Sequence, residues 1–151
     1  FSGELELKSS VRVLDVGVGS GVLALAALRL GAGHAIGFDL DLCAVREAGR
    51  AGRENGLAER LGLMAGPITA LGEGQFELIL ANLLKRELLP LVSDLASHLA
   101  AGGSLLVSGL LHAERSEVEA RMGEVGLRCV GERVERDTTG DTWLSLRWTQ
   151  A

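Results

Sequence analysis

A chain of 151 residues with 47% hydrophobic content has the size and composition of one globular domain that buries a full core without disulfides or metals. Its net charge of −5 excludes the strongly basic surface of a general nucleic-acid binder, so no direct nucleic-acid partner is expected. Cys43 and Cys129 lie far apart, with no Cys-x-x-Cys pair or Cys/His cluster. We therefore expect no metal site, no disulfide framework and a cytoplasmic location.

The longest strongly apolar stretch, Val22 to Leu28, is too short to cross a bilayer, so no membrane association is expected. The sequence starts at Phe1-Ser2-Gly3 without an initiator Met. We expect a fragment of a longer protein in which residues 1–151 form a single domain. The sequence leaves the oligomeric state open.

Short apolar and β-branched runs bounded by turn-forming residues predict strands. These runs are Val11 to Asp15, Ala35 to Asp39, Leu61 to Ala65, Phe76 to Ala81 and Ser104 to Ser108. The segments between them predict helices over Val22 to Leu30, Leu42 to Glu54, Glu87 to Leu99 and about Ala113 to Glu124. Pro90 is expected in the first turn of its helix, and Gly102-Gly103 at the end of that helix.

The chain closes with two more predicted strands, about Leu127 to Glu135 and Thr142 to Trp148, separated by turn-forming residues. That spacing predicts an antiparallel hairpin. The preceding βα units predict a doubly wound α/β domain with a mostly parallel sheet. A terminal hairpin is unusual for a plain dinucleotide-binding domain. The whole pattern resembles the seven-stranded, Rossmann-like sheet of methyltransferase domains.

The first predicted strand runs into a glycine-rich turn, Asp15-Val16-Gly17-Val18-Gly19-Ser20-Gly21, and then into a helix. Glycine allows a tight turn and a close approach of the backbone to a ligand. The helix N-terminus that follows offers unpaired N–H groups. The segment therefore predicts a nucleotide-binding turn to which Gly17, Gly19, Ser20 and Gly21 contribute. A tight turn without a ligand is the alternative.

Two features favour S-adenosylmethionine over a nicotinamide dinucleotide as the ligand. Gly21 comes one residue earlier than the third glycine of Gly-x-Gly-x-x-Gly, and Val22 stands where that glycine would be. Asp15 would repel a pyrophosphate but could hold the cationic end of S-adenosylmethionine, directly or through water. We predict S-adenosylmethionine as the cofactor and Asp15 as one of its contacts.

Asp39 ends the second predicted strand and follows Gly21 by 18 residues. This is close to the separation of roughly 20 residues between a glycine-rich turn and an acid that reaches a ribose diol. A carboxylate can accept hydrogen bonds from both ribose hydroxyls. The alternative is that Asp39 or Asp41 caps the next helix, and we favour Asp41 for the cap. Leu40, beside Asp39, is included in the predicted cofactor site.

Asn82 follows the fourth predicted strand, which adjoins the first strand in a doubly wound sheet. It is therefore expected to face the glycine-rich turn. Its amide oxygen could accept from a substrate amine, orient the nitrogen lone pair toward a sulfonium methyl and stabilise the charge that grows on nitrogen. The alternative is that Asn82 satisfies backbone groups in a loop or caps a helix.

Four segments resemble the bacterial PrmA family, whose members methylate large-subunit ribosomal protein eleven: Asp15–Gly21, Gly37–Asp41, Phe76–Leu83 with Ala81-Asn82-Leu83, and Gly102–Leu111 with Ser108-Gly109-Leu110-Leu111. The resemblance runs from about Val11 to Trp148. It implies that Asp15, Gly17, Gly19 and Gly21 line the cofactor, that Asp39 holds its ribose and that Asn82 faces the methyl acceptor.

The sequence departs from that family in three places. The family has an N-terminal substrate-recruiting domain, to which nothing here corresponds, and a Phe-Gly-Thr-Gly-x-His-type loop, where this chain has only Phe1 to Ser10. The third family strand often ends in an acidic or polar residue near the adenine, whereas this chain has Ala65-Gly66-Pro67-Ile68. Backbone groups of Gly66 and Ile68 are the predicted adenine contacts.

These observations predict an S-adenosylmethionine-dependent methyltransferase that acts on an amine of a protein, such as a large-subunit ribosomal protein, with Asn82 as the catalytic residue. Two alternatives remain from the sequence. One is a Rossmann-type NAD(P)-dependent oxidoreductase. The other is a truncated domain that binds cofactor without turnover.

Overall fold

The computed structural model describes residues 6–151, so the observations on Phe1-Ser2-Gly3 lie outside the described residues. The chain divides into two units, residues 1–71 and residues 72–151, and each is described in turn. Among the described residues, no helix is long and apolar enough to span a membrane.

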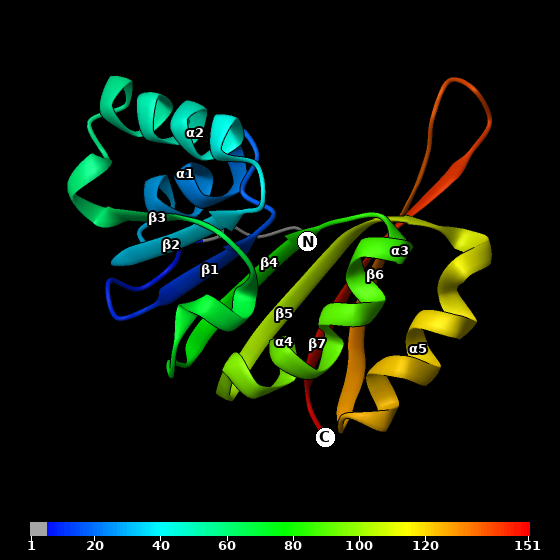
Figure 1. The fold of residues 1–151 in the computed structure, drawn as a ribbon. Coiled ribbons are helices and arrows are strands. Elements are labelled where there is room, and N and C mark those ends of the chain that lie inside the picture. The colour runs from blue at the N-terminus through cyan, green and yellow to red at the C-terminus, as the bar shows by residue number, and fades with distance from the viewer. Residues whose placement is uncertain (1–5) are drawn as a thin grey trace. The chain divides into compact units, whose positions relative to one another are not determined.

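In the first unit, three parallel strands lie in the order β3-β2-β1 (Figure 1). They are β1 (Arg12–Val16), β2 (His34–Asp39) and β3 (Leu61–Ala65). The helices are α1 (Val22–Arg29) and α2 (Leu42–Glu54), with 3-10 turns at Ala58–Arg60 and Ile68–Leu71. Helix α1 packs on β1 and β2, and α2 packs on β2 and β3.

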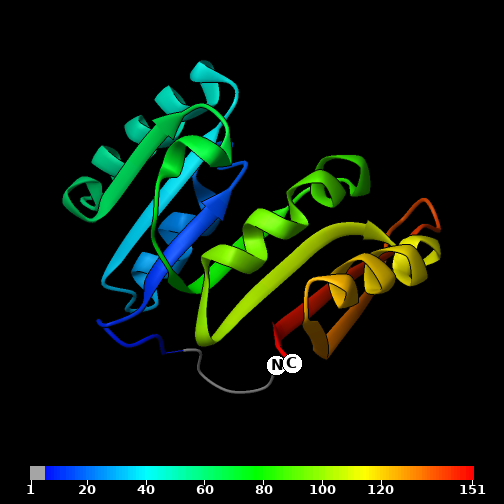
Figure 2. The same ribbon diagram turned by 60° about the horizontal axis from the view of Figure 1, so that its bottom comes forward.

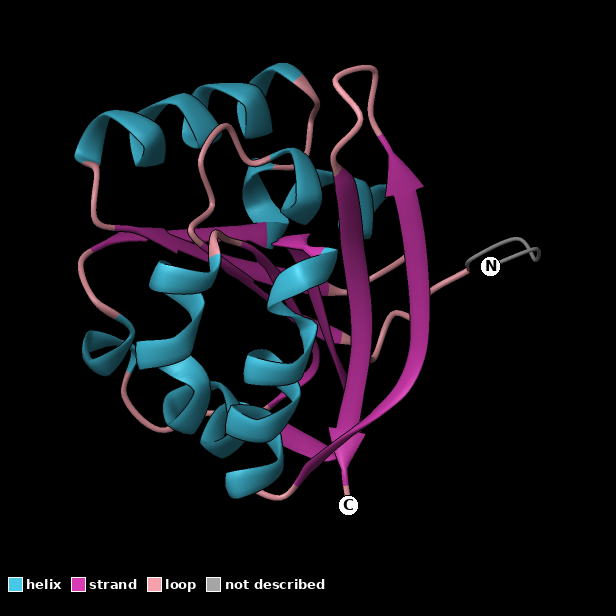
Figure 3. Cartoon of the chain, turned by 90° about the vertical axis from the view of Figure 1, so that its right-hand side faces the viewer, coloured by secondary structure: helices cyan, strands magenta, loops and turns pink. Residues whose placement is uncertain are grey.

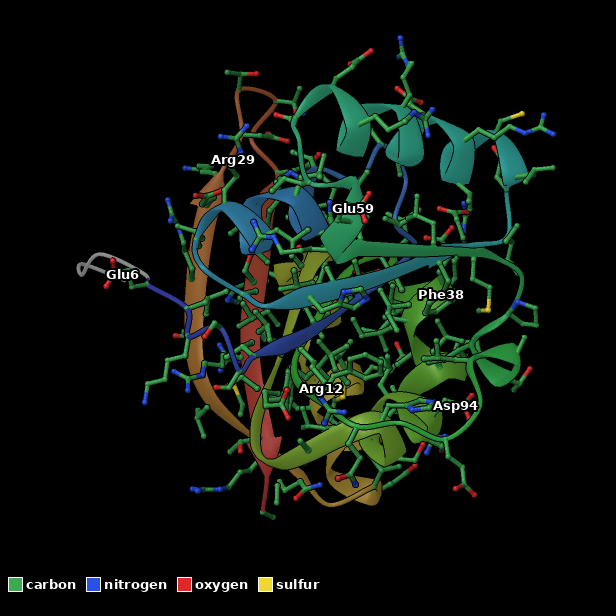
Figure 4. The ribbon with its side chains drawn as sticks, turned by 90° about the vertical axis from the view of Figure 1, so that its left-hand side faces the viewer. Glu6, Arg12, Arg29, Phe38, Glu59 and Asp94 are labelled. Carbon is green, nitrogen blue, oxygen red and sulfur yellow. The ribbon has the colours of Figure 1, made fainter. Side chains whose placement is uncertain are left out.

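The hydrophobic pattern explains this packing. Helix α1 is apolar almost all round, and its Ala24, Leu25, Ala27 and Leu28 are buried. Phe38 of β2 is buried as well (Figure 4). At the end of α1, Arg29 donates hydrogen bonds to the main-chain carbonyl of Asn55 at 3.3 Å and to its side-chain oxygen at 3.1 Å. This contact links the C-terminal ends of the two helices.

In the second unit, the strands lie in the order β4-β5-β7-β6 (Figure 2). They are β4 (Phe76–Asn82), β5 (Leu99–Leu111), β6 (Leu127–Arg136) and β7 (Thr142–Gln150). The α-helices are α3 (Lys85–Leu88), α4 (Val92–His98) and α5 (Arg115–Glu124). Short 3-10 turns occupy Leu89–Leu91 and His112–Glu114. Strands β4 and β5 are parallel, whereas β7 is antiparallel to both β5 and β6.

The predicted terminal hairpin is confirmed, and β6 and β7 run side by side for most of their length (Figure 3). Its turn is organised by Asp137, whose Oδ1 accepts from the main-chain N–H groups of Thr139 and Asp141, both at 2.9 Å. Oδ2 of Asp137 accepts from the indole N–H of Trp143 at 2.8 Å. The hydrogen bond from Trp143 has the largest effect in lowering the pKa of Asp137 to about 2, and those from Thr139 and Asp141 add to it.

The predicted helix over Glu87 to Leu99 is wrong in its bounds and its continuity. Helical structure starts at Lys85, and a 3-10 turn containing Pro90 separates α3 from α4. Proline lacks the N–H that a continuous α-helix needs at that point.

The predicted end of that helix at Gly102-Gly103 is wrong too, because both residues lie inside β5, which is much longer than Ser104 to Ser108. A Cβ on Gly103 would stand 2.8 Å from the Ala100 carbonyl oxygen and 3.1 Å from that of Glu77. The glycine is needed for a close approach of β4 and β5, not for a helix stop.

Candidate functional site

The turn after β1 is built on three glycines in the left-handed region. Gly17, Gly19 and Gly21 have φ values of 69°, 52° and 85°. Only glycine adopts such angles at little cost. At Gly21 a Cβ would also stand 3.0 Å from the Cβ of Ala48 in α2. In the segment Gly17 to Gly21, called the glycine turn, backbone conformation favours glycine at all three positions, and the packing of α2 requires it at Gly21 as well.

Asp15 is buried at the end of β1, with 1% of its surface exposed. Its Oδ2 accepts from the main-chain N–H of Ala24 at 2.9 Å, in the first turn of α1. Burial raises the pKa of Asp15 to about 7, against the lowering effect of the Ala24 hydrogen bond, and the charge of Asp39 adds to the rise. Asp15 thus supports the start of α1, and its predicted contact with the cationic end of a cofactor stays a prediction.

Asp39, at the end of β2, holds the glycine turn in place. Its Oδ2 accepts from the N–H of Gly19 at 3.0 Å, and its Oδ1 accepts from the N–H of Asp41 at 3.0 Å. Asp41 in turn accepts from the N–H of Cys43 at 2.8 Å, which confirms that Asp41 is the N-cap of α2. Each carboxylate oxygen of Asp39 keeps a further lone pair for another donor. Asp39 is therefore oriented for a second role such as binding a diol.

Apolar side chains beside these polar groups are unusually exposed. Leu40 is 80% exposed, directly after Asp39, and Val22 is 66% exposed at the start of α1. Ser20, the only predicted site residue of the glycine turn with a side chain, is exposed too. Exposed apolar side chains next to an ordered carboxylate suit a ligand with both an aromatic ring and hydroxyl groups.

Gly66 and Ile68 follow β3, where adenine contacts were predicted. The N–H of Gly66 donates to the main-chain carbonyl of Asp39 at 2.9 Å. The side chain of Ile68 is only 2% exposed and belongs to the core. Any contact of Gly66 with a ligand must therefore use groups other than its N–H, and Ile68 can offer its main chain. The predicted role of both residues stays untested.

Asn82 belongs to the second unit, at the end of β4 and opposite Ser108 of β5 in the parallel register. Its side chain is exposed, and its Oδ1 accepts from the hydroxyl of Ser108 at 3.1 Å. The N–H of Leu83 donates to the Ser108 carbonyl at 3.1 Å and holds the two strand ends together. The expected proximity of Asn82 to the glycine turn stays a prediction.

The helical segments that follow β4 and β5 start with the same kind of hydrogen bond, from a leucine N–H to the side chain of a glutamate three residues later. The N–H of Leu84 donates to Oε2 of Glu87 at 3.1 Å, and the N–H of Leu111 donates to Oε2 of Glu114 at 2.9 Å. Lys85 lies 2.6 Å from Glu117 and 4.0 Å from Glu114, and the hydrogen bond to Glu117 raises its pKa. These ion pairs join Lys85, the first residue of α3, to the 3-10 turn after β5 and to α5.

Sequence reasoning missed two contacts, Gly19 with Asp39 and Ser108 with Asn82. Only the second had a signal in the sequence, since a polar residue and a glycine follow directly on the apolar part of β5. Both contacts are between residues that parallel strands place at their carboxyl ends, where open α/β sheets bind their ligands.

Comparison with known families shows which family the chain belongs to. The model of the ribosomal protein L11 methyltransferase (PrmA) family matches residues 4–149, nearly the entire chain. The chain belongs to this family. The PrmA resemblance drawn from the motifs is thereby confirmed, and with it the assignment to class I S-adenosylmethionine-dependent methyltransferases.

Individual PrmA proteins are similar over most of the chain. A ribosomal protein L11 methyltransferase of Geobacter sulfurreducens is 45% identical over 119 residues, covering 79% of this chain and 39% of that protein. One from Desulfitobacterium hafniense is 34% identical over 148 residues, covering 98% of this chain and 46% of that protein. The chain thus spans less than half the length of these curated relatives.

A solved PrmA structure confirms the fold class. The ribosomal protein L11 methylase of Lactobacillus delbrueckii subsp. bulgaricus has a TM-score of 0.82 and 30% identity. The match covers 93% of this chain and 70% of that one. The fold is the seven-stranded, mostly parallel methyltransferase sheet with an antiparallel C-terminal hairpin, as predicted.

Proposed function

We propose that this chain is the catalytic part of an S-adenosylmethionine-dependent methyltransferase that acts on an amine of ribosomal protein L11. The observation that carries the proposal is the PrmA family match over residues 4–149, which includes the glycine turn, Asp39 and Asn82. Methylation of a ribosomal protein would take place in the cytoplasm, where ribosomes are assembled. The nucleic acid of the ribosome is not the expected contact, because the chain carries a net charge of −5.

The residues of the first unit fit the cofactor chemically. The buried carboxyl of Asp15 can compensate a cationic amino group, and the oriented carboxylate of Asp39 can accept from ribose hydroxyls. The exposed apolar side chain of Leu40 offers a surface for a purine ring. A Cβ on Gly19 would meet nothing closer than the Gly17 carbonyl oxygen at 3.9 Å, so the turn is open for a ligand at that point.

When bound, S-adenosylmethionine supplies a methyl carbon on a cationic sulfur; transfer forms a nitrogen–carbon bond while the carbon–sulfur electron pair goes to sulfur. Asn82 then has two tasks. Its Oδ1 accepts from an N–H of the acceptor amine and directs the nitrogen lone pair. The same oxygen stabilises the positive charge that grows on nitrogen, and the surplus proton is released to solvent.

A lysine-type acceptor has an ordinary pKa near 10.4 and must lose a proton before it can attack. We assign no general base to this step. Burial of the amine beside exposed apolar side chains such as Leu84 and Leu111 would lower its pKa by desolvation. Catalysis then depends mainly on positioning.

Calorimetry with S-adenosylhomocysteine and with NAD separates the proposal from an NAD(P)-dependent oxidoreductase. We expect micromolar-range binding of S-adenosylhomocysteine and no heat with NAD. The opposite preference would contradict the proposal. A labelled-methyl transfer assay against whole lysate then separates a methyltransferase from a domain that binds cofactor without turnover. Label in a protein of the size of L11 is the expected result.

A further inference from the structure

We propose that Ser108 is a positioning residue that orients the carboxamide of Asn82 for methyl transfer, an inference that rests on the function proposed above. The hydroxyl of Ser108 donates to Oδ1 of Asn82 at 3.1 Å. Without a partner, the terminal torsion of an asparagine side chain is broad, and its oxygen samples many directions. A hydrogen bond from a neighbouring strand restricts that motion.

The backbone around this pair keeps both side chains in register. Asn82 and Ser108 are direct partners in the parallel pairing of β4 with β5. One residue further, the N–H of Leu83 donates to the Ser108 carbonyl at 3.1 Å. The hydroxyl therefore reaches Asn82 from the strand residue that is paired with it.

Gly109 leaves space for the same oxygen, because it has no side chain. It has a φ of 84°, and a Cβ there would stand 2.9 Å from Oδ1 of Asn82 and 2.9 Å from the Leu83 carbonyl oxygen. Any side chain at position 109 would push against the carboxamide. Ser108 thus donates to one lone pair of Oδ1. Gly109 has no side chain that would displace the carboxamide of Asn82. The second lone pair stays available for an acceptor amine.

Steady-state kinetics of the 151-residue chain with labelled S-adenosylmethionine and purified ribosomal protein L11 test this role. Ser108→Ala should lower kcat about tenfold, the effect expected for loss of one aligned hydrogen bond, and leave the KM for S-adenosylmethionine unchanged. Ser108→Thr retains the hydroxyl and should restore most of kcat. An unchanged kcat in Ser108→Ala, or an equal loss in both variants, would overturn the proposal.

Two controls separate positioning from a general effect on β5. Ser104→Ala removes another hydroxyl of the same strand, one that accepts from Nε of Arg147 at 3.1 Å, and should leave kcat unchanged. Ser108→Ala combined with Asn82→Ala should be no slower than Asn82→Ala alone, because Ser108 acts through Asn82. Additive losses would mean that Ser108 acts independently and would refute the inference.

The orientation can also be measured without any turnover. In ¹H–¹⁵N spectra, the side-chain NH₂ resonances of Asn82 should shift in Ser108→Ala and stay near their wild-type positions in Ser108→Thr and Ser104→Ala. Unshifted resonances in Ser108→Ala would overturn the proposal. If wild-type protein methylates no L11, the proposed function fails, while these spectra still decide whether Ser108 holds Asn82.

Discussion

The main-chain N–H of Gly19 donates to Oδ2 of Asp39 at 3.0 Å, so the acid at the end of β2 fixes the glycine turn at the end of β1. The other oxygen, Oδ1, is held by the N–H of Asp41. Two N–H donors leave the carboxylate little rotational freedom. Asp39 therefore links the conformation of the turn to the orientation of the group that is proposed to bind ribose.

Asp39→Ala should weaken binding of S-adenosylhomocysteine by at least about tenfold, since it removes an oriented charged acceptor. Asp41→Ala is the matched control, because it leaves the N–H of residue 41 but removes the N-cap of α2. It should lower the free energy of unfolding by about 0.5–2 kcal/mol and leave the affinity within about twofold. Calorimetry and chemical denaturation measure both. Similar affinities in the two variants would contradict a ribose role for Asp39.

Gly21→Ala should destabilise the protein more than Gly56→Ala does. Both glycines have positive φ, 85° and 68°, so both substitutions strain the backbone by about 1–2 kcal/mol. Only at Gly21 would the new Cβ meet Ala48, at 3.0 Å, whereas nothing lies within 4 Å of the Cβ position at Gly56. Denaturant titration should show an extra loss of roughly 1–3 kcal/mol for Gly21→Ala. Equal losses would show that α2 does not pack against the turn.

The raised pKa of Asp15 predicts that stability falls as pH rises from about 4 to 7. A carboxyl whose pKa is about 7 in the folded state and 3.8 when unfolded favours the folded protein most when it is protonated in both states. Its contribution is fully present below pH 4, is lost progressively up to about pH 7 and is constant above, with a total on the order of 4 kcal/mol at most. The lowered pKa of Asp137 acts only below about pH 4 and does not overlap this window.

Asp15→Asn should remove the pH dependence that Asp15 causes. Urea titrations at pH 5 and pH 8 should give a larger unfolding free energy at pH 5 for the wild type and a much smaller difference for the variant. The same difference in both proteins would place the titrating group elsewhere.

Binding of S-adenosylhomocysteine provides a second pH test for Asp15. If the ionised carboxylate holds the ligand's amino group, affinity should rise up to tenfold per pH unit below about pH 7 and level off above it. The dependence should vanish in Asp15→Asn. A wild-type affinity that is flat between pH 5 and 7 would mean that Asp15 only supports α1.

Asn82→Ala should lower kcat by about a hundredfold or more, because it removes both the orienting acceptor and the group that stabilises charge on nitrogen. Affinity for S-adenosylhomocysteine should change by less than about threefold. Equal losses in kcat and affinity would assign Asn82 to cofactor binding instead of catalysis.

The fold was predictable where the sequence carries clear signals for the start and the end of a helix or strand. Helix α2 has the bounds expected from Asp41 at its start and Asn55-Gly56 at its end, because a cap and a left-handed glycine define helix termini locally. The region from Lys85 to Leu111 was predicted less well. Pro90 interrupts the helix, and the pairing of β4 with β5 extends β5 through a glycine pair that would otherwise indicate a turn.

The site was predictable as a set of positions but not as a set of contacts. Asp39 and Asn82 stand at strand ends, which a periodicity argument can locate. Two hydrogen bonds, one from Gly19 to Asp39 and one from Ser108 to Asn82, depend on strand register and on side-chain rotamers. Neither is encoded within a short window of sequence. The burial that raises the pKa of Asp15 is likewise a property of the packed core.

Transfer of a labelled methyl group from S-adenosylmethionine to purified ribosomal protein L11 tests the central claim most directly. We predict time-dependent label in L11 with the wild-type chain and a rate lower by about a hundredfold or more with Asn82→Ala. A chain that binds S-adenosylhomocysteine but transfers no label to L11 would contradict the account, as would transfer at the same rate by Asn82→Ala.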